Sequence, residues 1–191
     1  MSEAEVMAGG RSRTMRVDGP EGALAVLMLT GGPADAAGYA DIATRLANSG
    51  LRSYVLEDVA GLEAADIITI LDGLGAHWAH LAGSGAGAAL AWQVAARNFD
   101  RISSLVVVDE GHPAAADTEG LVLDAGCPAV EVATTLILTA DDHRTRAYGT
   151  GRHTYSDYRV VELPAGTPGG VVDSALAASL ATEIILRSNP W

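Results

Sequence analysis

The chain contains no lysine: all 12 of its basic residues are arginine, against 24 acidic residues among 191. Without a lysine amine, Schiff-base chemistry and a Walker-type phosphate loop are both excluded. The net charge of −12 also argues against nucleic acid or an anionic membrane as a partner, because like charges repel. We therefore expect the partner to be a small-molecule substrate.

Cysteine is nearly absent as well, and Cys127 is the only one. A single thiol excludes an internal disulfide and a cysteine-based metal cage, and we expect neither a metal nor another cofactor. The sequence has no run of 18 apolar residues, and its N-terminus lacks the apolar core of a signal peptide. These absences predict a soluble, cytoplasmic protein.

What the chain does contain is apolar sequence: 49% of its residues are hydrophobic and 19% are charged. A globular chain of this length buries about 70% of its unfolded surface in one domain. The first 22 residues are polar and rich in glycine, with at most one short strand at 14–17. We predict a poorly ordered segment over 1–22 and a single domain over 23–191.

Short apolar runs alternate with segments of helical periodicity from residue 24 onward. This alternation predicts an α/β fold with a doubly wound, mostly parallel sheet and helices on both faces. Residues 110–133 and 143–157 show no clear period and are predicted to be loops. We expect about six strands, over residues 24–30, 53–56, 77–82, 102–108, 134–139 and 158–163.

The most informative stretch is 77–97, where an apolar strand turns sharply into a helix through Ala82-Gly83-Ser84-Gly85-Ala86. Such a turn crowds its backbone, so the flanking side chains must be small. Only Ser84 in this turn carries a functional group. The pattern is typical of a nucleophile elbow, with alanine in place of glycine two residues on either side of the serine.

Two other interpretations fit the same residues. Gly83, Gly85 and Ala88 also match the dinucleotide-binding pattern G-x-G-x-x-A, and Asp109 ends the next strand, where a ribose-binding acid would lie. That pattern belongs in the first strand–helix unit, whereas Gly83 follows roughly two such units. The turn is otherwise explained as a small-residue contact that lets a helix pack close to its strand.

The order of these parts resembles the α/β-hydrolase family from about residue 24 to 187. Residues 29–33 (LTGGP) are similar to the HGGP loop of that family, with Thr30 in place of histidine. The resemblance implies that the backbone N–H groups of Gly32 and Gly85 form an oxyanion hole. It also implies that Ser84 is the nucleophile.

The other two members of the family's catalytic triad are matched unequally. The strand ending LILTADD aligns Asp142 with the catalytic acid, although a helix cap or turn carboxylate explains it equally simply. The loop 162–170 resembles the one that presents the catalytic histidine, but Thr167 and Pro168 stand where the histidine is expected. His112, just past the end of the strand at 102–108, is the leading substitute base, and Asp109 is an alternative acid.

The resemblance implies an esterase- or thioesterase-like enzyme acting on a small carbonyl, ester or thioester metabolite. Because the triad is incomplete, cyclisation, elimination or isomerisation in a biosynthetic reaction is expected rather than hydrolysis. The alternative is a non-catalytic member of the fold that binds a ligand or a partner protein. The segment between Asp109 and Thr134 leaves no room for a lid domain, so loops or a second subunit in a homodimer would close the pocket.

Overall fold

The computed structural model describes residues 2–32, 38–117, 119–139, 144–163 and 172–189. Within these residues the chain forms one mixed sheet of eight strands in the order β1-β2-β4-β3-β5-β6-β7-β8. The strands β3 to β8 pair in parallel, whereas β1 pairs with β2 and β2 with β4 in antiparallel fashion. Their bounds are β1 Ser2–Ala8, β2 Arg11–Asp18, β3 Ala25–Leu29, β4 Arg52–Leu56, β5 Ala79–Ser84, β6 Ile102–Val108, β7 Ala133–Leu138 and β8 Tyr158–Glu162.

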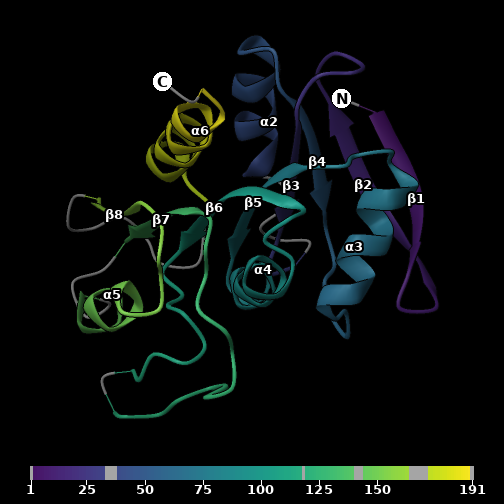
Figure 1. Cartoon of the computed structure of the whole chain (residues 1–191). Coiled ribbons are helices and arrows are strands. Elements are labelled where there is room, and N and C mark those ends of the chain that lie inside the picture. Colours follow the sequence, from purple (N-terminus) through teal and green to yellow (C-terminus); the bar gives the residue numbers. More distant parts are fainter. Residues whose placement is uncertain (1, 33–37, 118, 140–143, 164–171, 190–191) are drawn as a thin grey trace.

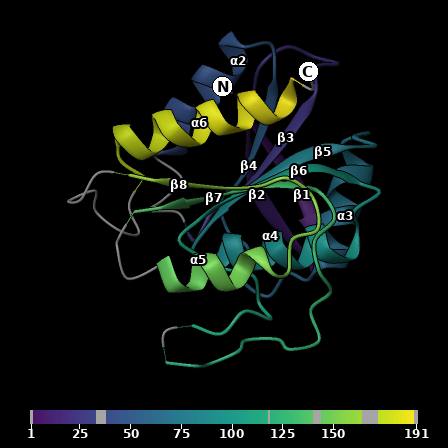
Figure 2. The ribbon, with the colours of Figure 1, turned by 60° about the vertical axis from the view of Figure 1, so that its left-hand side comes forward.

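Helices cover both faces of the sheet, as Figure 1 shows. On one face lie α2 and α6, and on the other lie α3, α4 and α5, an arrangement that the rotated view in Figure 2 confirms. Each face holds its own apolar core, because neighbouring strand residues point to opposite sides of the sheet. The bounds are α2 Tyr39–Asn48, α3 Ala64–Gly73, α4 Ala86–Arg97, α5 Arg144–Gly151 and α6 Ser174–Ser188.

The structure confirms the α/β fold and all six predicted strands, which are β3 to β8. Continuous apolar runs identify the inner strands, because parallel strands covered on both faces are buried along their length, whereas the edge strand β8 is only partly buried. The side chains of β3, for example, are all buried.

The prediction of a poorly ordered N-terminal segment was wrong. Residues 2–18 form the hairpin of β1 and β2, which turns at Gly9 and Gly10 and pairs with β4 from Met15 to Asp18. Along β1 the partly or fully buried residues Ala4, Val6 and Ala8 alternate with exposed residues. The polar composition of the segment obscured this period of two. The hairpin extends the same sheet, and the assignment of 23–191 to one domain stays a prediction.

The prediction of a loop over 143–157 was also wrong in part, because α5 occupies residues 144–151. The helix has a weak apolar stripe and two glycines, so its sequence gives little helical signal. Tertiary contacts hold it in place: Ala147 and Thr150 are buried, and the Tyr158 hydroxyl donates to the Ala147 carbonyl. The described part of 110–132, in contrast, is a loop as predicted.

Candidate functional site

The turn between β5 and α4 lies at the carboxyl edge of the sheet. Ser84 is the last residue of β5, Ala86 is the first of α4, and Gly85 between them has φ 51° and ψ −128°. L-amino acids with a side chain rarely adopt this backbone conformation. Gly85, and not Ser84, is therefore the apex of the turn.

The two glycines on either side of Gly85 are required by close packing. A Cβ atom on Gly83 would come within 2.7 Å of the Gly87 carbonyl oxygen, and one on Gly87 within 2.1 Å of the Leu29 carbonyl oxygen. These contacts match the two small positions of a nucleophile elbow, two residues before and after its apex. The turn therefore has the elbow's shape and also the close helix packing that the simplest sequence interpretation predicted.

The placement of Ser84 at the apex was an error of one residue. In the sequence Gly83-Ser84-Gly85-Ala86-Gly87, the glycine pattern G-x-x-x-G is centred on Gly85. The serine drew attention because it is the only functional side chain in the turn. The two glycines that flank Gly85, compared with the two alanines that flank Ser84, were the signal that gave the correct register.

Ser84 faces α2 rather than an open edge of the sheet. Its hydroxyl accepts a hydrogen bond of 2.9 Å from the hydroxyl of Tyr39, the first residue of α2. Tyr39 is fully buried and Ser84 is 9% exposed. The sequence predicts the serine, but it gives no sign of this tyrosine partner, because the two residues meet only when α2 packs on the sheet.

The loop after β3 lies against the turn. A Cβ atom on Gly85 would meet only the Gly31 Cα, at 3.7 Å, so the space beside the apex is open enough for a side chain. The Thr30 hydroxyl lies 3.2 Å from the Gly32 carbonyl oxygen and 3.0 Å from that of Glu57. Thr30 thus ties the loop to the residue that follows β4.

Asp109, the alternative acid, follows β6 with a φ of 59°. Its carboxylate accepts hydrogen bonds from the Thr139 backbone N–H at 2.7 Å and from the Thr139 hydroxyl at 2.5 Å. Because Thr139 follows β7, this contact joins the carboxyl ends of two neighbouring strands. It gives Asp109 a clear structural task beside any role in a site.

His112 lies on the opposite face of the sheet from Ser84. Its Nε2 donates to the Pro128 carbonyl at 2.9 Å while its Nδ1 accepts from the Ala114 N–H at 3.1 Å. Its ring packs edge-on against Trp92 of α4 and stacks on His153, with centroids 4.9 Å apart. Both ring nitrogens are therefore occupied away from the turn, and the structure does not bring His112 and Ser84 together.

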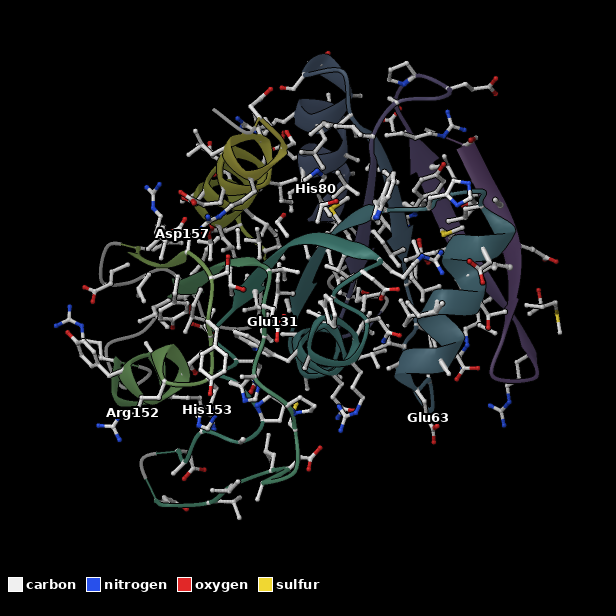
Figure 3. The ribbon with its side chains drawn as sticks, viewed as in Figure 1. Glu63, His80, Glu131, Arg152, His153 and Asp157 are labelled. Carbon is white, nitrogen blue, oxygen red and sulfur yellow. The ribbon has the colours of Figure 1, made fainter. Side chains whose placement is uncertain are left out.

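Burial fixes the protonation state of two histidines. Removal from water lowers the pKa of His112 to about 4, and it also lowers the pKa of His80. His80 lies on β5, where Nδ1 is 2.8 Å from the Ser104 hydroxyl (Figure 3). At neutral pH both imidazoles are uncharged parts of the core.

The remaining predicted site residues lie outside the described part of the chain. These are Asp142, Thr167 and Pro168, together with His143. Among the described residues, no group of three or more His, Cys, Asp or Glu side chains is placed to hold a metal ion. None of the described helices has the length and apolar character needed to cross a membrane.

No protein-family model and no curated protein sequence matches this chain. Solved structures do. Epoxide hydrolase A from Mycobacterium thermoresistibile superimposes with a TM-score of 0.77 at 14% identity, covering 97% of this chain and 98% of that one. The enol-lactonase from Burkholderia xenovorans LB400 gives a TM-score of 0.73 at 14% identity, covering 97% and 99%. The thioesterase domain from the curacin biosynthetic pathway gives 0.69 at 15% identity, also covering 97% and 99%.

These neighbours differ in the reactions that their names describe, and their low identities restrict the likeness to architecture. The architecture is nevertheless matched over almost the whole of both chains. The elbow-shaped turn at Gly85 and the mostly parallel sheet agree with it. The chain has the α/β-hydrolase fold.

Proposed function

We propose that this chain binds a small carbonyl or ester compound at the carboxyl edge of its sheet without forming a covalent acyl intermediate. This is the ligand-binding alternative that the sequence left open. One observation carries it: glycine occupies the apex of the elbow, the position at which the fold's hydrolases carry their nucleophile. Glycine has no atom that can attack a carbonyl carbon.

The groups that would hold a carbonyl oxygen are retained. With Gly85 at the apex, the donor of the elbow becomes the N–H of the following residue, Ala86, rather than that of Gly85 itself. This N–H belongs to the first turn of α4, where backbone donors have no partner within the helix and the helix dipole favours negative charge. Gly32 in the loop after β3 supplies the second donor, as the resemblance to the family implies.

The space beside Gly85 supports binding of a ligand in the place of a side chain. An added Cβ would make only ordinary contact there, with the Gly31 Cα at 3.7 Å. A ligand atom is accommodated where a nucleophilic hydroxyl stands in a hydrolase. A ligand would therefore occupy the space beside the elbow without forming a covalent bond to it.

Among the described residues no base is placed to take a proton from the Ser84 hydroxyl. No histidine follows His153 in the chain, and His112 is neutral and hydrogen-bonded on the other face of the sheet. The Ser84 hydroxyl accepts a hydrogen bond from Tyr39, so one of the two lone pairs of its oxygen is engaged. Without a base, a serine hydroxyl is a poor nucleophile.

The test compares the wild type with Ser84→Ala and Gly85→Ser. We expect no labelling of the wild type by a fluorophosphonate and no hydrolysis of nitrophenyl acetate above the background rate. Ser84→Ala should leave both results unchanged and should cost about 1 kcal/mol of stability through loss of the Tyr39 hydrogen bond. Ester hydrolysis by the wild type that disappears in Ser84→Ala would contradict the proposal.

Binding itself is measured by the shift in melting temperature with a lactone, a short ester and an acetyl thioester. At least one of these probes should stabilise the wild type, because a ligand that binds only the folded state raises its melting temperature. Gly85→Ser places a hydroxymethyl group in the open space and should abolish that shift. A shift that persists in Gly85→Ser, or no shift with all three probes, would count against binding at the elbow.

A further inference from the structure

The loop between β6 and β7 carries three consecutive aliphatic side chains on its surface. Leu121 is 60% exposed, Val122 37% and Leu123 61%. We call residues 121–123 the apolar tip. Single exposed apolar residues are ordinary, but contiguous ones are costly and mark surfaces that another molecule covers.

Hydrogen bonds hold the apolar tip in one conformation. The Asp117 carboxylate accepts from the backbone N–H groups of Glu119 and Leu121, while the Asp117 N–H donates to the Leu121 carbonyl. After the tip, the Asp124 N–H donates to the Pro113 carbonyl, and its carboxylate pairs with Arg97 of α4. A surface fixed in this way loses little conformational entropy when it binds.

Acidic side chains lie near both ends of the apolar tip. Asp124 follows it directly and is paired with Arg97, whereas Glu119 precedes it with Gly120 in between. Among the described residues no arginine forms an ion pair with Glu119. The complement of the tip and Glu119 is therefore an apolar surface that carries a positive charge.

A surface of that kind lies at the end of α5. Tyr148 is 79% exposed and Tyr155 is 75% exposed, and Arg152, between them in the sequence, is exposed as well. Figure 3 shows Arg152 pointing away from the body of the molecule. Within the described ranges no acidic side chain forms an ion pair with Arg152, unlike Arg144, Arg146 and Arg159 on the neighbouring segments. We call Tyr148, Arg152 and Tyr155 the tyrosine–arginine patch.

The two surfaces belong to adjoining segments. Arg146 of α5 pairs with Asp117 at 3.7 Å, and Gly149 lies against Ala115 and Ala116. In Figures 1 and 2 the loop extends beyond α5 on the same side of the sheet. A two-fold axis that sets the apolar tip of one copy on the patch of the other repeats the same contact in reverse, which is how an isologous interface forms.

We propose that two copies of this chain pair through reciprocal contact of the apolar tip with the tyrosine–arginine patch. The leucines of the tip pack on the faces of the two tyrosines, and Glu119 pairs with Arg152 of the other copy. The second copy is favoured over an unrelated protein because one chain presents both halves of the match, in apolar character and in charge. The pairing is independent of the function proposed for the elbow.

Sedimentation equilibrium of the full chain over a range of concentrations tests the pairing. The wild type should be a dimer. The variant that carries both Leu121→Asp and Leu123→Asp should dimerise more weakly, with its dissociation constant raised by at least about tenfold for each leucine removed. Leu24→Asp is the matched control, because Leu24 is 58% exposed and lies outside both surfaces. It should not change the dissociation constant.

Charge reversal tests the register of the contact. Glu119→Arg and Arg152→Glu should each weaken the dimer, whereas the chain carrying both should recover it, because each copy then again offers opposite charges to the other. Arg11→Glu is the charge-matched control, because Arg11 is exposed and lies in β2, outside both surfaces. Circular dichroism should show every variant folded, since all of these side chains are exposed.

A wild type that stays monomeric at all concentrations would overturn the proposal. A dimer that the tip variants leave intact would do so too, since it would form through another face. Failure of the double charge reversal to recover the dimer would exclude the paired contact of Glu119 with Arg152.

Discussion

His112 illustrates how a residue's surroundings decide its chemistry. A histidine just past the end of a parallel strand is placed where such sheets bind ligands. In this structure its ring is instead enclosed by Trp92, His153 and two backbone hydrogen bonds. Burial is the largest cause of its lowered pKa, and the nearby charges of His153 and Arg97 lower the pKa further, whereas Pro128 and Asp124 raise it.

The first prediction follows from this pKa. The value is about 4 in the folded chain and 6.5 in the ordinary case, so the folded state favours the neutral imidazole. Its contribution to stability is complete above about pH 6.5 and is lost as the pH falls through 4, by an amount on the order of 3 kcal/mol. Urea unfolding of the wild type at a series of pH values measures this slope.

His112→Gln is the control for that slope. Glutamine offers one donor and one acceptor but does not titrate, so the variant should be less stable at pH 7 and should show a flatter decline between pH 6.5 and 4. Carboxylates contribute equally to both proteins. Equal slopes in the two proteins would show that His112 does not cause the acid sensitivity.

The unit of β5, the turn and α4 depends on two glycines for different reasons. Gly87 is excluded from carrying a Cβ by the carbonyl oxygen of Leu29, a backbone atom that cannot move alone. Gly85 has room for a Cβ but an unfavourable φ. Space and conformation therefore make separate demands on neighbouring positions of one turn.

The second prediction separates these demands. Gly87→Ala should destabilise the protein by about 3 kcal/mol or more, because α4 must move away from the end of β3. Gly85→Ala should cost only about 1–2 kcal/mol, the usual penalty for a side chain in a left-handed conformation. Chemical denaturation of the two variants gives the comparison. Equal losses, or a larger loss for Gly85→Ala, would show that packing against β3 is not the stronger constraint.

Over the molecule as a whole, negative charge is in excess. The chain carries a net charge of −12, and several of its described ion pairs are exposed on both sides, such as Arg45 with Asp41 and Arg144 with Glu162. Exposed pairs of this kind stabilise little, whereas repulsion among many like charges acts over the whole surface.

The third prediction is that added salt stabilises the protein. Raising sodium chloride from a low concentration to about 0.3 M shortens the screening length and weakens the repulsion, so the melting temperature should rise by a few degrees. Calorimetry at fixed pH and fixed protein concentration measures the change. A melting temperature that falls with salt would mean that the surface ion pairs outweigh the excess charge.

The sequence alone determined the strands from β3 to β8 and the sharp turn after β5. Apolar runs reveal the inner parallel strands because nearly all of their side chains are covered, whereas the edge strand β8 is largely exposed. Small residues reveal a crowded turn because only they fit. Both signals lie within a few consecutive residues. The same local view missed β1 and α5 and found only residues 14–17 of β2. Contacts with residues distant along the chain stabilise these elements: β4 for the hairpin, and Ala115 and Tyr158 for α5.

The candidate site was decided by the tertiary structure. The backbone angles of Gly85 identify it as the apex, and the close approach of Gly87 to Leu29 explains the glycine spacing that the sequence already contained. Tyr39 and Ser84 meet because α2 packs on one face of the sheet, whereas His112 packs against Trp92 of α4 on the other face. A sequence shows which side chains are available for chemistry, but which of them meet depends on the face of the sheet to which each one points, and that is set by the assembled fold.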